Sequence, residues 1–204
     1  MPQFNSEQIT ADELNSCCAD FKELEKRGTF YDMALKLIEK GFETEAFFLI
    51  LATWNFATFR YAMKDFDIKG FKQTIENECN PVFEKLKGQK LETANFDLLK
   101  GDIVSLYNIL SAIKGVKYTG ASKLMHLKNP NLFVMWDGYI KKRYGFGNGT
   151  AQDYVEFLKK MQSKFGQVNW QGTGRTLAKA IDEYNYTTIT LPELEKQRQN
   201  RKRK

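Results

Sequence analysis

The most specific part of this sequence is "AIKGVKYTGASKLMHLKNPNLFVMWDGYIKKRYG", residues 112–145. It holds two glycines, Gly115 and Gly120, within a short basic turn and the small-residue start of a helix. An isolated acid, Asp137, stands between a tryptophan and a glycine, just before the basic run 141–143. A single carboxylate in such apolar and basic surroundings needs an explanation, and the rest of the chain supplies the context.

The bulk composition indicates a globular protein. The chain has 204 residues, 42% of them hydrophobic and 14% aromatic, which is enough for one sizeable core. No apolar run approaches the roughly 20 residues needed to span a bilayer. The N-terminal segment is polar and acidic, unlike a secretory signal. We therefore expect a monomeric intracellular protein of the cytoplasm or nucleoid, without a membrane partner.

The cysteine and histidine content argues against metal chemistry. The three cysteines are an odd number without metal-ligand spacing, and free thiols in a reducing compartment are the simplest interpretation. The single histidine, His126, lies among apolar residues and is interpreted as packing or a local cap. We expect no metal site, no iron–sulfur cluster and no other cofactor.

Charge is distributed unevenly. The formal net charge is +6, and residues 196–204, "KQRQNRKRK", carry six basic residues and no acid, so residues 1–195 are neutral (6 − 6 = 0). Residues 114–143 carry seven Lys or Arg against Asp137 alone. A basic stripe with a basic tail favours a polyanion partner on one face. A frayed, solvated end is an equal alternative for the tail.

Helical spacing dominates the chain. Ile103, Leu106, Leu110 and Ile113 fall on one helical face and predict an amphipathic helix. The same pattern predicts one all-α unit over 1–188 with about ten helices, followed by a basic C-terminal tail at 189–204. Only "TTITL", residues 187–191, has the composition of an extended segment.

A helix-hairpin-helix is predicted at about 102–128. The turn holds a glycine that permits close backbone approach, and the second helix presents free N–H groups and its positive dipole end. Such a clamp grips phosphates without reading sequence. Alone, a glycine-rich turn between helices is a weak signal. The predicted DNA-binding residues of the hairpin and of the following basic run are Lys114, Gly115, Lys117, Tyr118, Gly120, Lys141 and Arg143.

The segments 113–121, "IKGVKYTGA", and 134–140, "VMWDGYI", resemble the signature of the helix-hairpin-helix base-excision DNA glycosylases, the endonuclease III superfamily. The resemblance implies a two-lobed helical fold and extends more weakly over about 40–186. It implies double-stranded DNA with a damaged base as partner, and a catalytic role for Asp137. It also matches "LATWNFATF", residues 51–59, to the helix that enters the DNA near the flipped base.

Departures from the pattern bear on the reaction type. Lys117 replaces the second hairpin glycine, and Thr119 stands where bifunctional members carry their Schiff-base lysine. Lys123 lies one turn later on the same face. We therefore predict Lys123 as the nucleophile, with a solvated or phosphate-binding lysine as the alternative. Asp137 has a plain alternative too, because Asp is common as a helix N-cap, and both roles are compatible.

Aromatic side chains are candidates for holding a flipped base. The predicted base-pocket residues are Trp54, Trp136, Tyr139 and Trp170, although aromatics at helical spacing are more often core residues. Asn55, in an apolar helix, is either a DNA-probing residue or a buried structural amide.

These patterns leave three hypotheses for function. The first is a DNA glycosylase that removes an oxidised purine such as 8-oxoguanine, with or without AP-lyase activity. Its variant is a monofunctional glycosylase that removes an alkylated purine. The second is a non-catalytic DNA-binding protein with a glycosylase fold. The third is an unrelated helical protein, which predicts no salt-sensitive affinity for DNA.

Overall fold

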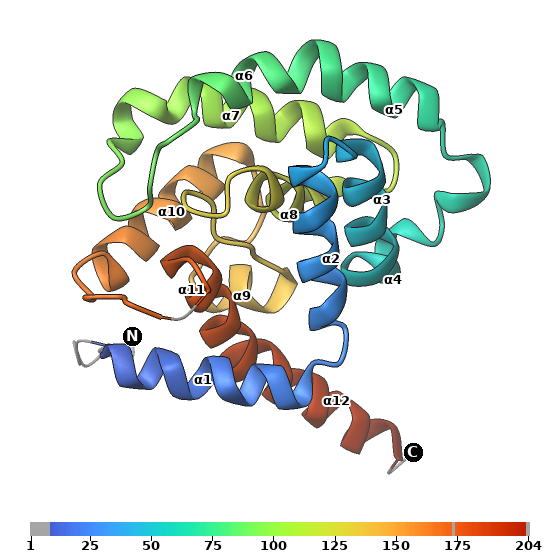
Figure 1. Ribbon diagram of the computed structural model, residues 1–204. Coiled ribbons are helices and arrows are strands. Elements are labelled where there is room, and N and C mark those ends of the chain that lie inside the picture. The colour runs from blue at the N-terminus through green and yellow to red at the C-terminus, as the bar shows by residue number, and fades with distance from the viewer. Residues whose placement is uncertain (1–8, 173, 203–204) are drawn as a thin grey trace.

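The computed structural model describes residues 9–172 and 174–202. It is 72% helix, and neither described range contains a β-strand (Figure 1). This confirms the all-α prediction. The helices are α1 Ala11–Leu24, α2 Gly28–Glu39, α3 Glu43–Trp54, α4 Phe56–Phe59, α5 Ile68–Thr74, α6 Asn80–Lys85, α7 Phe96–Ala112, α8 Lys117–Lys128, α9 Gly138–Arg143, α10 Ala151–Phe165, α11 Leu177–Asn185 and α12 Leu191–Lys202.

Local capping chemistry explains where several helices begin. Thr10 and Glu13 form a capping box at α1, and Thr150 and Asp153 form one at α10. In each box the two side chains accept hydrogen bonds from one another's backbone N–H groups, which would otherwise be unpaired at the helix start. Asn95 caps α7 in a simpler way, because its side chain alone accepts from two backbone N–H groups.

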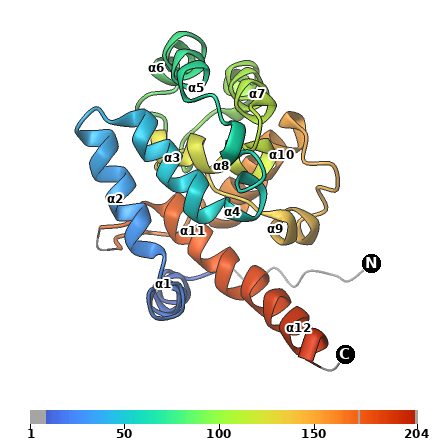
Figure 2. The same cartoon turned by 90° about the vertical axis from the view of Figure 1, so that its right-hand side faces the viewer.

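Helix α8 lies at the middle of the molecule in both views (Figures 1 and 2). Residues 120–122 and 124–127 are buried, and α7, α3 and α2 all pack against it. His126 is part of this packing: its Nδ1 donates to the Phe133 carbonyl, which leaves Nε2 to accept from the Tyr31 hydroxyl, 2.8 Å away. Burial lowers the pKa of His126 to about 3, so the ring is neutral, which confirms its interpretation as a packing residue.

The predicted hairpin consists of α7 and α8, joined by residues 113–116. The two helices pack against each other, and the buried side chains of α7 include Ile103, Leu106 and Leu110. These three residues belong to the face from which the sequence predicted this helix. The hairpin lines the central core, and the chain beyond it returns through residues 129–137 to α9.

The C-terminal region differs from the sequence prediction. The predicted extended segment, residues 187–191, is helical instead: a π-helical segment, Tyr186–Thr190, joins α11 directly to α12, which begins at Leu191. β-branched residues favour strands, but in this segment the Thr187 and Thr188 hydroxyls donate to the carbonyls of Glu183 and Tyr184, four residues earlier. Bonds of this kind are how threonine hydroxyls are satisfied within a helix, and the helical path continues without a break from α11 through this segment into α12.

Helix α12 then projects from the body (Figure 2) and buries none of its residues. None of the helices in the two described ranges is both long and apolar enough to cross a membrane.

Candidate functional site

Asp137 caps α9 with its side chain. Its Oδ1 accepts from the backbone N–H groups of Tyr139 and Ile140 at 2.8 and 2.9 Å, and its Oδ2 accepts from the Thr190 hydroxyl at 2.7 Å. The carboxylate is half-buried and held in one orientation by three donors. Asp137 therefore has the cap role, while its carboxylate also borders a cavity.

Lys123 projects from α8 into the same cavity. Its ammonium donates to the carbonyl of Trp54, at the end of α3. Burial lowers the pKa of Lys123 to about 8, against the opposing influence of the Asp137 and Asp182 carboxylates. A lysine with a pKa near 8 has an appreciable neutral fraction at physiological pH, which is the form that acts as a nucleophile.

This cavity, of about 310 Å³, brings Asp137 and Lys123 together. Its walls come from α3, α8, α9 and the segment that joins α11 to α12. Thr119, where the resemblance places the Schiff-base lysine of bifunctional glycosylases, also lines it. In such a cavity a half-buried amine can attack an electrophilic carbon, and an oriented carboxylate can stabilise the positive charge that develops on it.

The hairpin turn is built for close backbone approach. Gly115 has φ +86°, and a Cβ there would lie 2.5 Å from the Cβ of Ala62. Asn55 donates both amide hydrogens inside the protein, to the carbonyls of Gly115 and Val116 at 3.0 and 3.1 Å. Gly120 is buried against the same amide, since an added Cβ would meet Asn55 Nδ2 at 2.9 Å. Both Asn55 and Gly120 thus hold the hairpin to α3, which favours the structural alternative for Asn55.

Two lysines of the turn face a shallow hollow of about 370 Å³ beside Gly115. Lys114 Nζ lies 3.8 Å from Asp65 Oδ2, and both side chains are exposed. An exposed ion pair of this kind contributes little to the stability of the fold. Lys117 is exposed and has φ +50°, in the left-handed region where the family pattern has glycine. This hollow adjoins the Asp137 cavity, because Ala57 and Thr58 line both.

The remaining predicted DNA contacts are Lys141, Tyr118 and Arg143, and they differ in how far solvent reaches them. Lys141 is 7% exposed, and its ammonium donates to the Gly147 carbonyl at 2.6 Å and lies 4.4 Å from the Tyr118 ring centroid. The ammonium of Lys141 is therefore bound inside the protein, so the prediction that it contacts phosphate is wrong. Tyr118 is half-buried under this cation, whereas Arg143 is exposed and lines a groove beyond α9.

The four predicted base-pocket aromatics separate into two pairs. Trp54 and Tyr139 line the cavity, and Trp136 contributes atoms to the same wall. Trp136 is 1% exposed, and its ring packs against Tyr154 and other core rings, so it has no free face for a base. Trp170 lies outside the cavity, with its Nε1 donating to the Arg175 carbonyl at 2.9 Å. The base-stacking predictions for Trp136 and Trp170 are thus wrong, because both rings are used in packing or local bonding.

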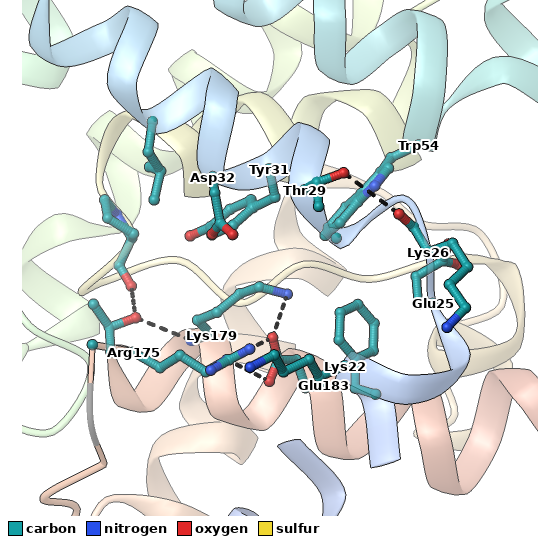
Figure 3. A pocket seen from close by; sticks show the side chains of 16 residues that line it. Lys22, Glu25, Lys26, Thr29, Tyr31, Asp32, Trp54, Arg175, Lys179 and Glu183 are labelled. Atoms are coloured by element: carbon teal, nitrogen blue, oxygen red, sulfur yellow. Dashed lines mark hydrogen bonds and ion pairs between the residues drawn. The ribbon is translucent and has the colours of Figure 1, made fainter. Parts of the chain in front are cut away.

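A second cavity, of about 400 Å³, lies behind Trp54 (Figure 3). There the ammonium of Lys179 sits 2.9 Å from Asp182 and 3.3 Å from Glu183, and Arg175 pairs with Glu183 from the other side. The sequence interpretation missed this network. Its signal was present: in the helix within "TGRTLAKAIDEY", one lysine and two acids stand at i, i+3 and i+4 among buried apolar residues.

The aromatic rings connect the two cavities. Lys179 Nζ lies 4.6, 4.8 and 4.8 Å from the ring centroids of Phe21, Tyr31 and Trp54. Trp54 stacks on Tyr31 and lines both cavities. Asp182 lines the Lys123 cavity while pairing with Lys179. The buried ion network therefore forms the wall that separates the candidate site from the second cavity.

Comparison with known proteins gives no match to this chain, whether with protein-family models, curated proteins or solved structures.

Proposed function

We propose that this protein is a DNA glycosylase that flips a damaged base out of double-stranded DNA and removes it. The observation that carries the proposal is the shared cavity of Lys123 and Asp137, beside the hairpin turn at Gly115. The hairpin grips the backbone, and the neighbouring cavity receives the extruded nucleotide. The resemblance of 113–121 and 134–140 to the endonuclease III superfamily supports the same assignment, including its two-lobed fold.

The chemistry follows from the two side chains. Breaking an N-glycosidic bond leaves positive charge on the sugar, and the Asp137 carboxylate, oriented by Thr190 and the start of α9, stabilises it. The neutral amine of Lys123 attacks C1′, the bond from C1′ to the base breaks, and the base leaves with the bonding electrons and takes up a proton. The C1′–O4′ bond then opens, O4′ gains a proton and the nitrogen loses one, which gives the imine. Loss of a C2′ proton from this imine eliminates the 3′ phosphate and cuts the strand, which makes the enzyme a bifunctional glycosylase and lyase. An oxidised purine such as 8-oxoguanine is our first choice of substrate.

A second candidate is a DNA-binding protein without chemistry. It is favoured by one observation, namely that both oxygens of Asp137 already accept hydrogen bonds as a cap. A carboxylate kept only for capping needs no substrate. The two candidates differ in whether a lesion-bearing duplex is changed by the protein.

Incubation with a panel of duplexes, each carrying one lesion, tests the proposal. Heat–alkali treatment reveals base removal, strand breaks without that treatment reveal lyase activity, and borohydride traps an imine. We expect release of an oxidised purine and a covalent adduct. Salt-sensitive binding with every lesion left intact would support the non-catalytic candidate, and no salt-sensitive binding would contradict both.

A further inference from the structure

A basic groove of about 880 Å³ adjoins the Asp137 cavity at lining residues other than those that the cavity shares with the hairpin hollow. It is lined by α9, by the end of α10, by the segment joining α11 to α12, and by the first turns of α12. Gly138 and Tyr139 line both the groove and the Asp137 cavity. The hairpin hollow, the cavity and the groove are therefore consecutive depressions that share lining residues.

The groove is strongly positive. Among its described lining residues are the cations Lys142, Arg143, Lys164 and Lys196 and the carboxylate of Glu193. Lys196 neutralises Glu193, with 2.7 Å between Nζ and Oε1. The groove thus keeps a net excess of positive charge after its internal ion pair is counted.

Like charges crowd one another at the α10 end. Desolvation lowers the pKa of Lys164, and the neighbouring charges of Arg143 and Lys160 lower it further. Repulsion of this kind is relieved when an anion enters. The dipoles of α9 and α10 explain the cations in their last turns, whereas Lys196 is paired with Glu193 on α12, a helix that has no buried residue.

The floor of the groove is aromatic and fixed. Tyr144 donates its hydroxyl to Asn185 Oδ1 at 2.8 Å, and Lys164 Nζ lies 5.4 Å from the Tyr184 ring centroid. Cations beside aromatic faces are typical of surfaces that follow a nucleic-acid strand. An acidic protein or an anionic membrane would need no continuity with the Asp137 cavity, and this continuity favours DNA.

We propose that the groove between α9, α10 and α12 binds the DNA phosphate backbone on the side of the flipped nucleotide opposite to the hairpin. The inference rests on the proposed function and adds a second grip to it. Helix α12, which has no core contact of its own, then holds one wall of the DNA path. The duplex is clamped at two places, with the reacting nucleotide between them.

The test compares Lys142→Glu/Lys196→Glu with a control, Lys90→Glu/Lys100→Glu. Both double variants change exposed lysines and lower the net charge equally, but Lys90 and Lys100 lie outside the three depressions. Binding is measured by fluorescence anisotropy against salt. The probes are a duplex with a central tetrahydrofuran abasic analogue and two duplexes shortened on one side or the other of it.

We expect the groove variant to lose about tenfold or more in affinity for the full duplex, with a salt slope smaller by about 2. The control should remain within about twofold of the wild type. One of the shortened duplexes should bind wild type and groove variant equally, because it lacks the contacted phosphates.

If both double variants lost the same affinity for DNA, the proposal that this groove binds DNA would be overturned, since the change in net charge alone would explain the loss. So would a groove variant that loses affinity for phosphatidylserine vesicles but keeps its affinity for DNA. A wild type with salt-sensitive DNA binding that the groove variant retains would reject the groove and leave the proposed function standing. A wild type without salt-sensitive DNA binding would reject the proposed function itself.

Discussion

Two lysines that face the interior, the buried Lys179 of α11 and the half-buried Lys123 of α8, have opposite surroundings. Lys179 is 3% exposed and is matched by two carboxylates, Asp182 at 2.9 Å and Glu183 at 3.3 Å. Its ammonium also lies within 4.8 Å of three aromatic ring centroids. These contacts occupy the Lys179 ammonium on all the sides described, so we interpret Lys179 as a structural cation.

Lys123 donates to a neutral carbonyl, that of Trp54, and borders an open cavity. Burial lowers its pKa to about 8, because the carboxylates of Asp137 and Asp182 only partly offset desolvation. Burial alone therefore does not make a lysine reactive. What matters is whether an anion compensates the burial, and at Lys123 the compensation is incomplete.

Lys123→Gln should have the strongest effect on the chemistry. Gln cannot form an imine, so borohydride should trap no adduct, and single-turnover base release should fall by about 1,000-fold or more. Radiolabelled or fluorescent DNA on a denaturing gel measures both. Efficient trapping by the Lys123→Gln protein would show that the nucleophile lies elsewhere, and Lys117 would be examined first.

Asp137→Asn should reduce base release by about 100- to 1,000-fold while keeping, or improving, affinity for lesion DNA. The substitution removes the charge at nearly constant shape, and Asn is also a good N-cap, so the fold should change little. Single-turnover cleavage and thermal melting are measured on the same preparation. A folded Asp137→Asn protein with unchanged cleavage would end the catalytic assignment and leave only the cap.

Lys179→Met should destabilise the fold without removing the nucleophile. It leaves Asp182 and Glu183 buried with Arg175 as the remaining cation of the network, and breaking a buried pair in this way costs about 3–5 kcal/mol. Urea denaturation measures the loss. Borohydride trapping per folded molecule should persist. If Lys179→Met folds normally but traps no DNA, then Lys179 is the reactive lysine and Lys123 the structural one.

How far the sequence alone leads is clear from this pair. The lone acid after an apolar run and a lysine one turn from the position of the Schiff-base lysine led to the prediction of Asp137 and Lys123, and the structure places both at one cavity. Lys179 was missed because the pattern "LAKAIDEY" is also that of an ordinary amphipathic helix, although both Lys179 and Glu183 are buried. Charges at i and i+4 on an apolar face indicate an internal ion pair.

The aromatic residues show the opposite difficulty. Periodicity tells which face of a helix is apolar, but it does not tell whether a ring fills the core, as Trp136 does, or a cavity wall, as Trp54 does. That depends on contacts between distant segments. The helices themselves were predictable from periodicity and caps, whereas the helical path of residues 187–191 was not, since these residues continue α11 into α12 despite their β-propensity.

The rate of borohydride trapping should depend on pH, with a change smaller than the loss expected from Lys123→Gln. With a pKa of about 8 for Lys123, the rate of the chemical step should rise about tenfold per pH unit below 8 and level off above it. The unfolded chain holds this proton to higher pH than the folded chain, so the Lys123 contribution to stability should increase as pH rises above about 8. A pH-independent rate between about 6 and 9 would contradict a lysine nucleophile.

Substitution of Lys117, an exposed lysine on the hairpin, should give the smallest effect of those predicted here on stability and DNA binding. Lys117 is exposed and strained, with φ +50° at a position where the family pattern has glycine. The left-handed conformation costs about 1–2 kcal/mol for a non-glycine residue, and glycine loses about 0.5–1 kcal/mol through its greater chain entropy. Lys117→Gly should therefore stabilise the fold by roughly 0.5–1 kcal/mol in urea denaturation.

The same change removes one positive charge beside the hairpin hollow, so the salt slope of DNA binding should decrease by about 0.9. Trapping under saturating protein should be unchanged, because the amine that attacks is that of Lys123. Lys117→Ala serves as the control: it removes the charge but keeps a Cβ in the left-handed conformation, so it should lower the slope equally without the gain in stability. If Lys117→Gly loses trapping while Lys123→Gln keeps it, the reactive lysine is the strained one on the hairpin, and the lowered pKa of Lys123 reflects burial without chemistry.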